Sequence, residues 1–257
     1  QALAAYRNAM GILDRSGRGE TITRAILQHD YAVSLIDLGE VAAAETSLHN
    51  MLQRVGRSDP TGHLPQQPLI HYAHTALYER HADSAEKYFA LLASQAAQEK
   101  NTYWQGRGLF GLAQAQLQLG DISAARRTIA QFDQLAAHQT AWNSDDQVMD
   151  PRMLEAQLAL ATGDTAKAHA TIVQLLQSKG YFGGTRRKTF RSALILAAET
   201  ALTLHHPAEA LAYARAVRTK ASMDSLAETR SAYVGEARLI EAHAMLAAGD
   251  SSGARQS

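Results

Sequence analysis

The stretch Leu112–Ala125 reads LAQAQLQLGDISAA, and a glycine–aspartate pair interrupts its helical pattern at Gly120. Before this pair the apolar residues recur every three or four positions, which is the period of an amphipathic helix. Glycine suits the left-handed conformation that ends a helix, and the following Asp121 can cap the next helix. The stretch therefore predicts a helical hairpin whose turn lies at Gly120.

The same interruption returns along the chain. Ala113 lies seven residues before Gly120, and Ala125 lies five residues after it. Alanines keep these two distances from six anchor positions, although two of the anchors are not glycine. The anchors are Gly39, Arg80, Gly120, Gly163, His205 and Gly249, which follow one another after 41, 40, 43, 42 and 44 residues. Such a period predicts a solenoid of repeated helical hairpins.

The two alanines of each repeat have a structural explanation. The first lies in the middle of one helix and the second in the first turns of the next, where two antiparallel helices approach closely and need small side chains. We expect these alanines to be buried together with a set of leucines. The expected core is Ala32, Ala44, Ala73, Ala85, Ala113, Ala125, Ala156, Ala168, Ala198, Ala210, Ala242 and Ala254, with Leu35, Leu77, Leu112, Leu117, Leu160, Leu202 and Leu246.

The composition narrows the possible functions. The 257 residues include 25 basic and 25 acidic side chains, so a dedicated nucleic-acid surface or a polybasic membrane surface is not expected. The absence of cysteine excludes a disulfide framework, a thiolate nucleophile and any zinc site that needs sulfur. The longest apolar run is broken by Glu199, so we expect no membrane insertion by this segment.

The repeat unit resembles the tetratricopeptide repeat in its first small residue, its turn of glycine and acid, and its second alanine. The resemblance covers nearly the whole chain, although the period exceeds the family's usual length of about 34 residues and the early tryptophan is absent. It implies an all-α fold of about six helical hairpins in a right-handed superhelix, forming one solenoid over residues 1–257. Because the first residues read as the second helix of an earlier repeat, we expect this solenoid to be a segment of a longer protein.

A second resemblance concerns Leu13–Leu48, which reads LDRSGRGETITRAILQHDYAVSLIDLGEVAAAETSL. It is similar to the tetratricopeptide regions that follow the kinase domain in some bacterial eukaryotic-like serine/threonine protein kinases, and Gly17–Thr21 carries much of the similarity. The resemblance implies a periplasmic sensor region that binds a partner and signals to the kinase through a membrane span. Two alternatives stay open, namely a cytoplasmic arm of a transcription regulator and an assembly scaffold.

One candidate binding surface is the concave face that the first helices of stacked hairpins line. The residue after each first alanine should point inward, as should the residue four positions further on. Arg107, seven residues before Gln114, joins this row. The two sets are Val33, His74, Gln114, Gln157, Glu199 and His243, and Asp37, Tyr78, Gln118, Ala161, Thr203 and Ala247.

The polar members of this row could hold an extended peptide by its backbone and side chains. The predicted partner-binding residues are His74, Tyr78, Arg107, Gln114, Gln118, Gln157 and Glu199. The alternative is a solvated groove without a ligand. The sequence does not identify the protein or peptide, and dimerisation stays open.

A second candidate surface is the connector SKGYFGGTRRKTFR, in which aromatic residues flank a basic cluster. The predicted contact residues are Tyr181, Phe182, Arg186, Arg187 and Lys188. Aromatic residues beside arginine suit a peptide, an acidic partner or a lipid surface. The alternative is a basic helix start whose aromatic side chains pack on neighbouring repeats.

Catalytic and metal sites are not expected. His71 and His74 are three residues apart and His81 follows, but no acidic residue completes a ligand set on that face. The chain lacks a G-x-S-x-G motif, a phosphate-binding loop, a dinucleotide loop and the kinase signature motifs. Asp145 and Asp146 read as solvated charges in a polar loop. The sequence therefore predicts no enzymatic activity and no cofactor for this segment.

Overall fold

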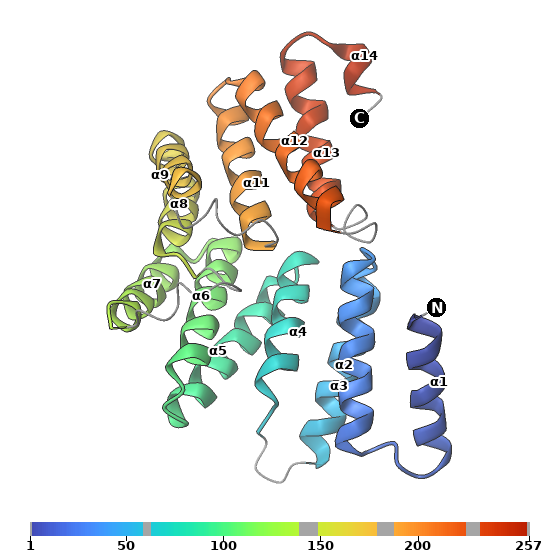
Figure 1. The fold of residues 1–257 in the computed structure, drawn as a ribbon. Coiled ribbons are helices and arrows are strands. Elements are labelled where there is room, and N and C mark those ends of the chain that lie inside the picture. Colours follow the sequence, from blue (N-terminus) through green and yellow to red (C-terminus); the bar gives the residue numbers. More distant parts are fainter. Residues whose placement is uncertain (1, 59–62, 139–148, 179–187, 225–231, 256–257) are drawn as a thin grey trace. The chain divides into compact units, whose positions relative to one another are not determined.

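The computed structural model describes residues 2–58, 63–138, 149–178, 188–224 and 232–255 (Figure 1). Within these ranges the secondary structure consists of thirteen α-helices and no strand, and consecutive helices of the same compact unit pack on one another. The chain divides into two compact units, Gln1–Leu119 and Gly120–Ser257. The predicted all-helical class is confirmed for the described residues.

The first unit contains six described helices, of which the second to the fifth form the two hairpins that turn at Gly39 and Arg80. Its helices are α1 (Ala2–Arg15), α2 (Ile22–Asp37), α3 (Val41–Ser58), α4 (Gln66–Tyr78), α5 (Ala82–Gln98) and α6 (Thr102–Leu119). Besides its sequence neighbours, α4 contacts both α2 and α6. The helices α2, α4 and α6 therefore form one layer, which we call the first-helix layer.

The second unit contains seven described helices. Its helices are α7 (Ile122–Ala136), α8 (Pro151–Ala161), α9 (Thr165–Gln177), α11 (Lys188–Thr203), α12 (Pro207–Asp224), α13 (Ala232–Ala247) and α14 (Ser251–Ala254). Here α11 contacts both α8 and α13, so the first helices of successive hairpins again touch each other.

The turn conformation predicted at the anchors is confirmed at all six positions. The φ angles are 79° at Gly39, 63° at Arg80, 78° at Gly120, 85° at Gly163, 62° at His205 and 84° at Gly249. At five of these turns the N–H of the residue after the anchor donates to the carbonyl five residues earlier, at 2.9 Å. These bonds satisfy carbonyl groups that the helix end would otherwise leave unpaired.

Three of the four acidic residues that follow glycine anchors cap the next helix, as the sequence indicates. The carboxylates of Asp121, Asp164 and Asp250 accept from the backbone N–H three residues further on, at 2.8, 3.0 and 2.8 Å. Each bond satisfies one of the free N–H groups of a helix N-terminus. The turn and the start of the second helix are therefore both determined by local sequence.

The predicted alanine core is confirmed for ten of the twelve positions, whose side chains are fully buried. The exceptions are Ala242 and Ala254, which are half-buried. Both belong to the hairpin of α13 and α14, and α14 has only 4 residues, so it covers less of its partner than a full helix would.

The leucine part of the predicted core is largely wrong. Only Leu35 is buried, while Leu246 is 54% exposed. The others are half-buried, namely Leu77, Leu112, Leu117, Leu160 and Leu202. The buried position lies four residues before the anchor, where Ala76, Ala159 and Ala201 stand, and most of the predicted leucines lie one residue further on. This shift of one residue turns them about 100° away from the core.

Helices α5 and α6 pack unusually closely because α6 carries two glycines on the side that faces α5. A Cβ atom added at Gly108 would lie 2.6 Å from the backbone nitrogen of Ala93, and one at Gly111 would overlap the ring of Phe89. The sequence analysis does not predict this contact. It places the α6 backbone directly against α5.

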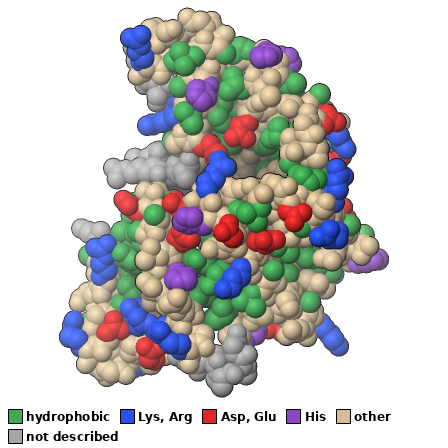
Figure 2. All heavy atoms as spheres, turned by 180° about the vertical axis from the view of Figure 1, so that it is seen from behind, with side chains coloured by type: hydrophobic (Ala, Val, Ile, Leu, Met, Phe, Trp, Pro, Cys, Tyr) green, Lys and Arg blue, Asp and Glu red, His purple; other side chains and the backbone are tan. Residues whose placement is uncertain are grey.

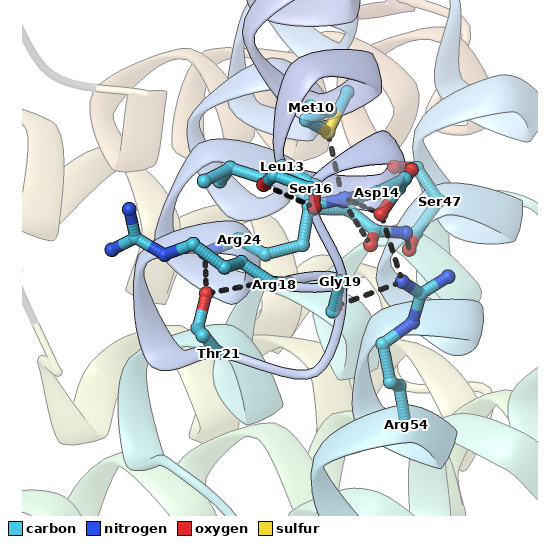
Figure 3. A network of polar contacts seen from close by, with 11 residues as sticks. Met10, Leu13, Asp14, Ser16, Arg18, Gly19, Thr21, Arg24, Ser47 and Arg54 are labelled. Carbon is cyan, nitrogen blue, oxygen red and sulfur yellow. Dashed lines mark hydrogen bonds and ion pairs between the residues drawn. The ribbon is translucent and has the colours of Figure 1, made fainter.

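A polar network fastens α1 to α2 and α3 (Figure 3). Arg24 Nε donates to Asp14 Oδ1 at 3.1 Å, and an NH group of Arg54 donates to the Gly19 carbonyl at 3.1 Å. The Thr21 hydroxyl accepts from the Arg24 N–H at 3.4 Å and so caps α2. A side chain at position 19 would meet the carboxylate of Asp14. In this structure the Gly17–Thr21 stretch thus forms a helix–helix turn.

Candidate functional site

The predicted partner-binding residues of the first unit lie on α4 and α6 in the first-helix layer. They are His74, Tyr78, Arg107, Gln114 and Gln118, and all five side chains are half-buried. On α6 the spacing of seven and four residues places Arg107, Gln114 and Gln118 along one side of the helix. Half-buried polar side chains of this kind can contact a ligand without a change in the fold.

Arg107 stacks on two aromatic rings of its own helix. Its guanidinium carbon lies 4.8 Å from the ring centre of Trp104 and 5.7 Å from that of Tyr103. These residues precede Arg107 by three and four positions, which is the spacing of neighbours on a helix surface. A guanidinium over an aromatic face is attracted by the ring's electron density. The three side chains therefore form an ordered cationic platform.

Burial changes the electrostatics of this platform. Desolvation lowers the pKa of Arg107 from its ordinary value, and the nearby Tyr103 partly opposes the shift. The guanidinium nevertheless remains charged, because arginine does not deprotonate under physiological conditions. Arg107 is thus a cation that has lost part of its hydration.

Several other described arginines form ion pairs with carboxylates, whereas Arg107 does not. Arg24 and Arg54 pair with Asp14, and Arg218 pairs with Glu241 at 2.8 Å. Within the described residues no carboxylate forms an ion pair with Arg107. The platform therefore presents positive charge that the described part of the chain does not neutralise.

His74 lies next to this platform on α4. Its pKa is lowered to about 3 by desolvation, by the charge of Arg107 and by His71, in that order. Although part of its surface reaches solvent, the ring packs edge-on against Phe89, with the ring centres 4.9 Å apart. His74 is therefore neutral at physiological pH and adds no charge beside Arg107.

A pair of stacked histidines joins α2 to α4. The rings of His29 and His71 are 7° from parallel with centres 4.9 Å apart, and His29 Nε2 lies 2.8 Å from His71 Nδ1. One of these two nitrogens must carry a proton and the other must accept it. The other ring nitrogen of His29 lies 3.1 Å from Asp30 Oδ1. The sequence analysis identified only His71, because no repeat position connects the two residues.

The histidines considered as metal ligands do not converge. His71 is engaged with His29, and the ring of His81 bonds to the carboxylate of Glu45 at 3.0 Å. Among the described residues no group of three or more histidine, aspartate or glutamate side chains is arranged to hold a metal ion.

In the second unit the predicted residues Gln157 and Glu199 lie on α8 and α11, and both are half-buried. Because these helices correspond to α4 and α6, the two residues occupy the same repeat position as His74 and Gln114. The structure brings His74 and Arg107 together in the first unit.

A hydroxyl–imidazole–carboxylate arrangement in the second unit has the composition of a catalytic triad. His169 Nδ1 lies 3.0 Å from Thr200 Oγ1, and His169 Nε2 lies 3.3 Å from Glu209 Oε1. Thr200 is fully buried, however, and its hydroxyl also donates to two carbonyls of its own helix. A nucleophile in that position could not reach a substrate, so the arrangement joins α9, α11 and α12 structurally.

The second predicted surface falls outside the described residues at Tyr181, Phe182, Arg186 and Arg187. Lys188 begins α11, and its side chain is likewise outside the description.

Comparison with known proteins adds no family assignment. No family model matches the chain, and no curated protein matches it. None of the described helices is long and apolar enough to cross a membrane. On the face shown in Figure 2, basic and acidic side chains are interspersed, which agrees with a formal net charge of +0.

Proposed function

We propose that this chain is a recognition module that binds a protein or peptide on the first-helix layer of its first unit. The observation that carries the proposal is Arg107, a half-buried cation stacked on Trp104 with no ion pair to a carboxylate in the described structure. Tryptophan, tyrosine and arginine dominate the binding energy of protein interfaces.

The neighbouring side chains suit a peptide ligand. Gln114 has an amide group of the kind that can both donate to and accept from a peptide backbone, and Tyr78 adds an aromatic surface with a hydroxyl. Both lie on helices that packing holds in place, so little conformational entropy would be lost on binding.

The hairpins, in this proposal, stack as a tetratricopeptide-like right-handed superhelix of about six repeats. Support comes from the left-handed residue at every anchor and from the contacts between first helices in both units. Repeats of this kind bury their faces against neighbours and leave an extended surface for recognition.

A narrower role is the sensor region of a bacterial membrane-spanning serine/threonine kinase, located in the periplasm. Its support is the resemblance of Leu13–Leu48 to regions of such kinases. The alternatives, a cytoplasmic arm of a transcription regulator and an assembly scaffold, would use the same binding surface. Reading the gene upstream of Gln1 separates them, because only the sensor role requires a kinase domain followed by a membrane span.

The recognition role is tested by selecting binders from a random dodecapeptide phage library on the purified chain. We expect the selected peptides to lose binding, by about tenfold or more, to a variant carrying Tyr78→Ala, Arg107→Ala and Gln114→Ala. The matched control carries Arg57→Ala and Gln98→Ala, which alter exposed residues on α3 and α5 of the same unit. Unchanged binding to the triple variant would contradict the proposal.

A further inference from the structure

Arg107 is partly desolvated, and none of the described carboxylates forms an ion pair with it. Removing a charged group from water costs free energy, and proteins normally offset that cost with an opposite charge. The cation–π contacts with Trp104 and Tyr103 offset part of it but leave the charge in place. An anion brought by a ligand would supply the missing interaction.

The described groups that interact with Arg107 are rings rather than carboxylates. Tyr103 and Trp104 contribute aromatic rings from its own helix, and His74 contributes an imidazole from α4. Desolvation chiefly, and the charge of Arg107 next, lower the pKa of His74. On α5, Glu86 accepts a hydrogen bond from Gln116 at 3.2 Å. Arg107 therefore presents a positive charge beside aromatic rings, with no described carboxylate paired to it.

We propose that the first unit recognises an acidic segment of its partner, with one glutamate or aspartate carboxylate pairing with Arg107 against the face of Trp104. This inference rests on the proposed recognition function. A guanidinium offers parallel N–H groups that match the two oxygens of a carboxylate. Stacking on Trp104 restricts the rotation of the guanidinium, so the pair forms with less loss of side-chain freedom.

A carboxylate fits this site better than a phosphate group. Phosphorylated residues are usually bound by clusters of arginines, since the group carries nearly two negative charges. Among the described residues at this site, one guanidinium lies beside the ring of Tyr103 and the imidazole of His74. One carboxylate would neutralise it, so the occupant is an acidic side chain of an unmodified peptide.

The test uses the complete chain and peptides selected from the dodecapeptide library. We expect glutamate or aspartate to be enriched at one position relative to the unselected library. By fluorescence anisotropy, Arg107→Gln should weaken the binding of the selected peptide by about tenfold, and glutamate→glutamine in the peptide should weaken it equally. When both changes are combined, the loss of affinity should be little larger than for either change alone, because both remove the same ion pair.

Matched variants separate recognition from folding. Arg57→Gln removes an exposed arginine of the same unit and should leave affinity unchanged. Arg107→Lys keeps the charge without the paired N–H groups, so its affinity for the peptide should lie between those of wild type and Arg107→Gln. Thermal melts followed by circular dichroism establish that each variant is folded.

The outcomes distinguish this inference from the broader function. Peptides that depend on the first-helix layer but contain no enriched acid would overturn the inference and leave the recognition role standing. Peptides that bind the triple variant as tightly as the wild type would overturn both the carboxylate inference and the recognition function. A phosphoserine peptide that binds about tenfold more tightly than its glutamate counterpart would replace the carboxylate with a phosphate ligand.

Discussion

At the scale of single residues, Arg80 and His205 hold a backbone conformation that glycine adopts more easily. Their φ angles of 63° and 62° match those of the glycine anchors, so the turn is retained at a cost in free energy. We predict that Arg80→Gly raises the free energy of unfolding by about 1 kcal/mol, measured by urea denaturation. The mirror control, Gly163→Ala, should lower it by about the same amount. A loss of stability in Arg80→Gly would contradict the turn assignment.

His74 gives the stability of the first unit a defined dependence on pH. Its folded pKa of about 3 lies below the ordinary value of 6.5, so the unfolded state binds the proton more readily. The contribution of neutral His74 to the free energy of unfolding is therefore complete above the unfolded pKa, and it is lost as the pH falls from 6.5 toward 3.

We predict that His74→Gln reduces the loss of unfolding free energy between about pH 7.5 and about pH 4.5, because glutamine does not titrate. Urea denaturation at both pH values measures the effect. The control is His243→Gln on α13, where the histidine is exposed. Equal pH dependence in wild type and His74→Gln would rule out a depressed pKa at this position.

At the scale of helices, the contact between α5 and α6 depends on Gly108. A methyl group there would meet the backbone of Ala93 at 2.6 and 2.8 Å, so the helices would have to separate. We predict that Gly108→Ala lowers the free energy of unfolding by about 1–3 kcal/mol, although alanine favours helix.

The comparison variant for this prediction is Gly56→Ala in α3. Its new methyl group would meet a side-chain atom of Leu64 at an ordinary 3.5 Å, so helix propensity should dominate. We expect a gain of about 0.5–1 kcal/mol. If both glycine variants were stabilised in urea denaturation, the close approach of α5 and α6 would be refuted.

The hairpin turns could be predicted from the sequence because their causes are local. A left-handed residue, a capping aspartate and two small side chains lie within a dozen consecutive residues, as around Gly120 and Asp121. The buried leucines were predicted one residue out of position, because apolar spacing does not decide which side of a broad apolar stripe faces the core.

The structural details of the candidate site could not be predicted in the same way. The stacking of His29 on His71 joins residues 42 positions apart, and no repeat position connects them. The depressed pKa of His74 likewise depends on burial and on Arg107 from another helix. The predicted concave-face positions include His74 and Arg107, but the proximity of these two residues depends on the packing of α4 on α6.

At the scale of the whole molecule, the chain combines two units built from the same hairpin. Each unit buries small residues between its helices, and the first helices of its successive hairpins contact one another. In the first unit Arg107 stacks on Trp104 and pairs with no described carboxylate, so we expect a ligand to bind chiefly to α4 and α6.

The most direct measurement is a nuclear magnetic resonance titration of the isotopically labelled chain with a peptide selected from the library. We predict that shifts concentrate on backbone amides of α4 and α6 and on the indole N–H of Trp104. The Arg107→Gln variant should lose these shifts at the same peptide concentration. Shifts confined to α3 and α5, or shifts that persist in Arg107→Gln, would contradict recognition at this site.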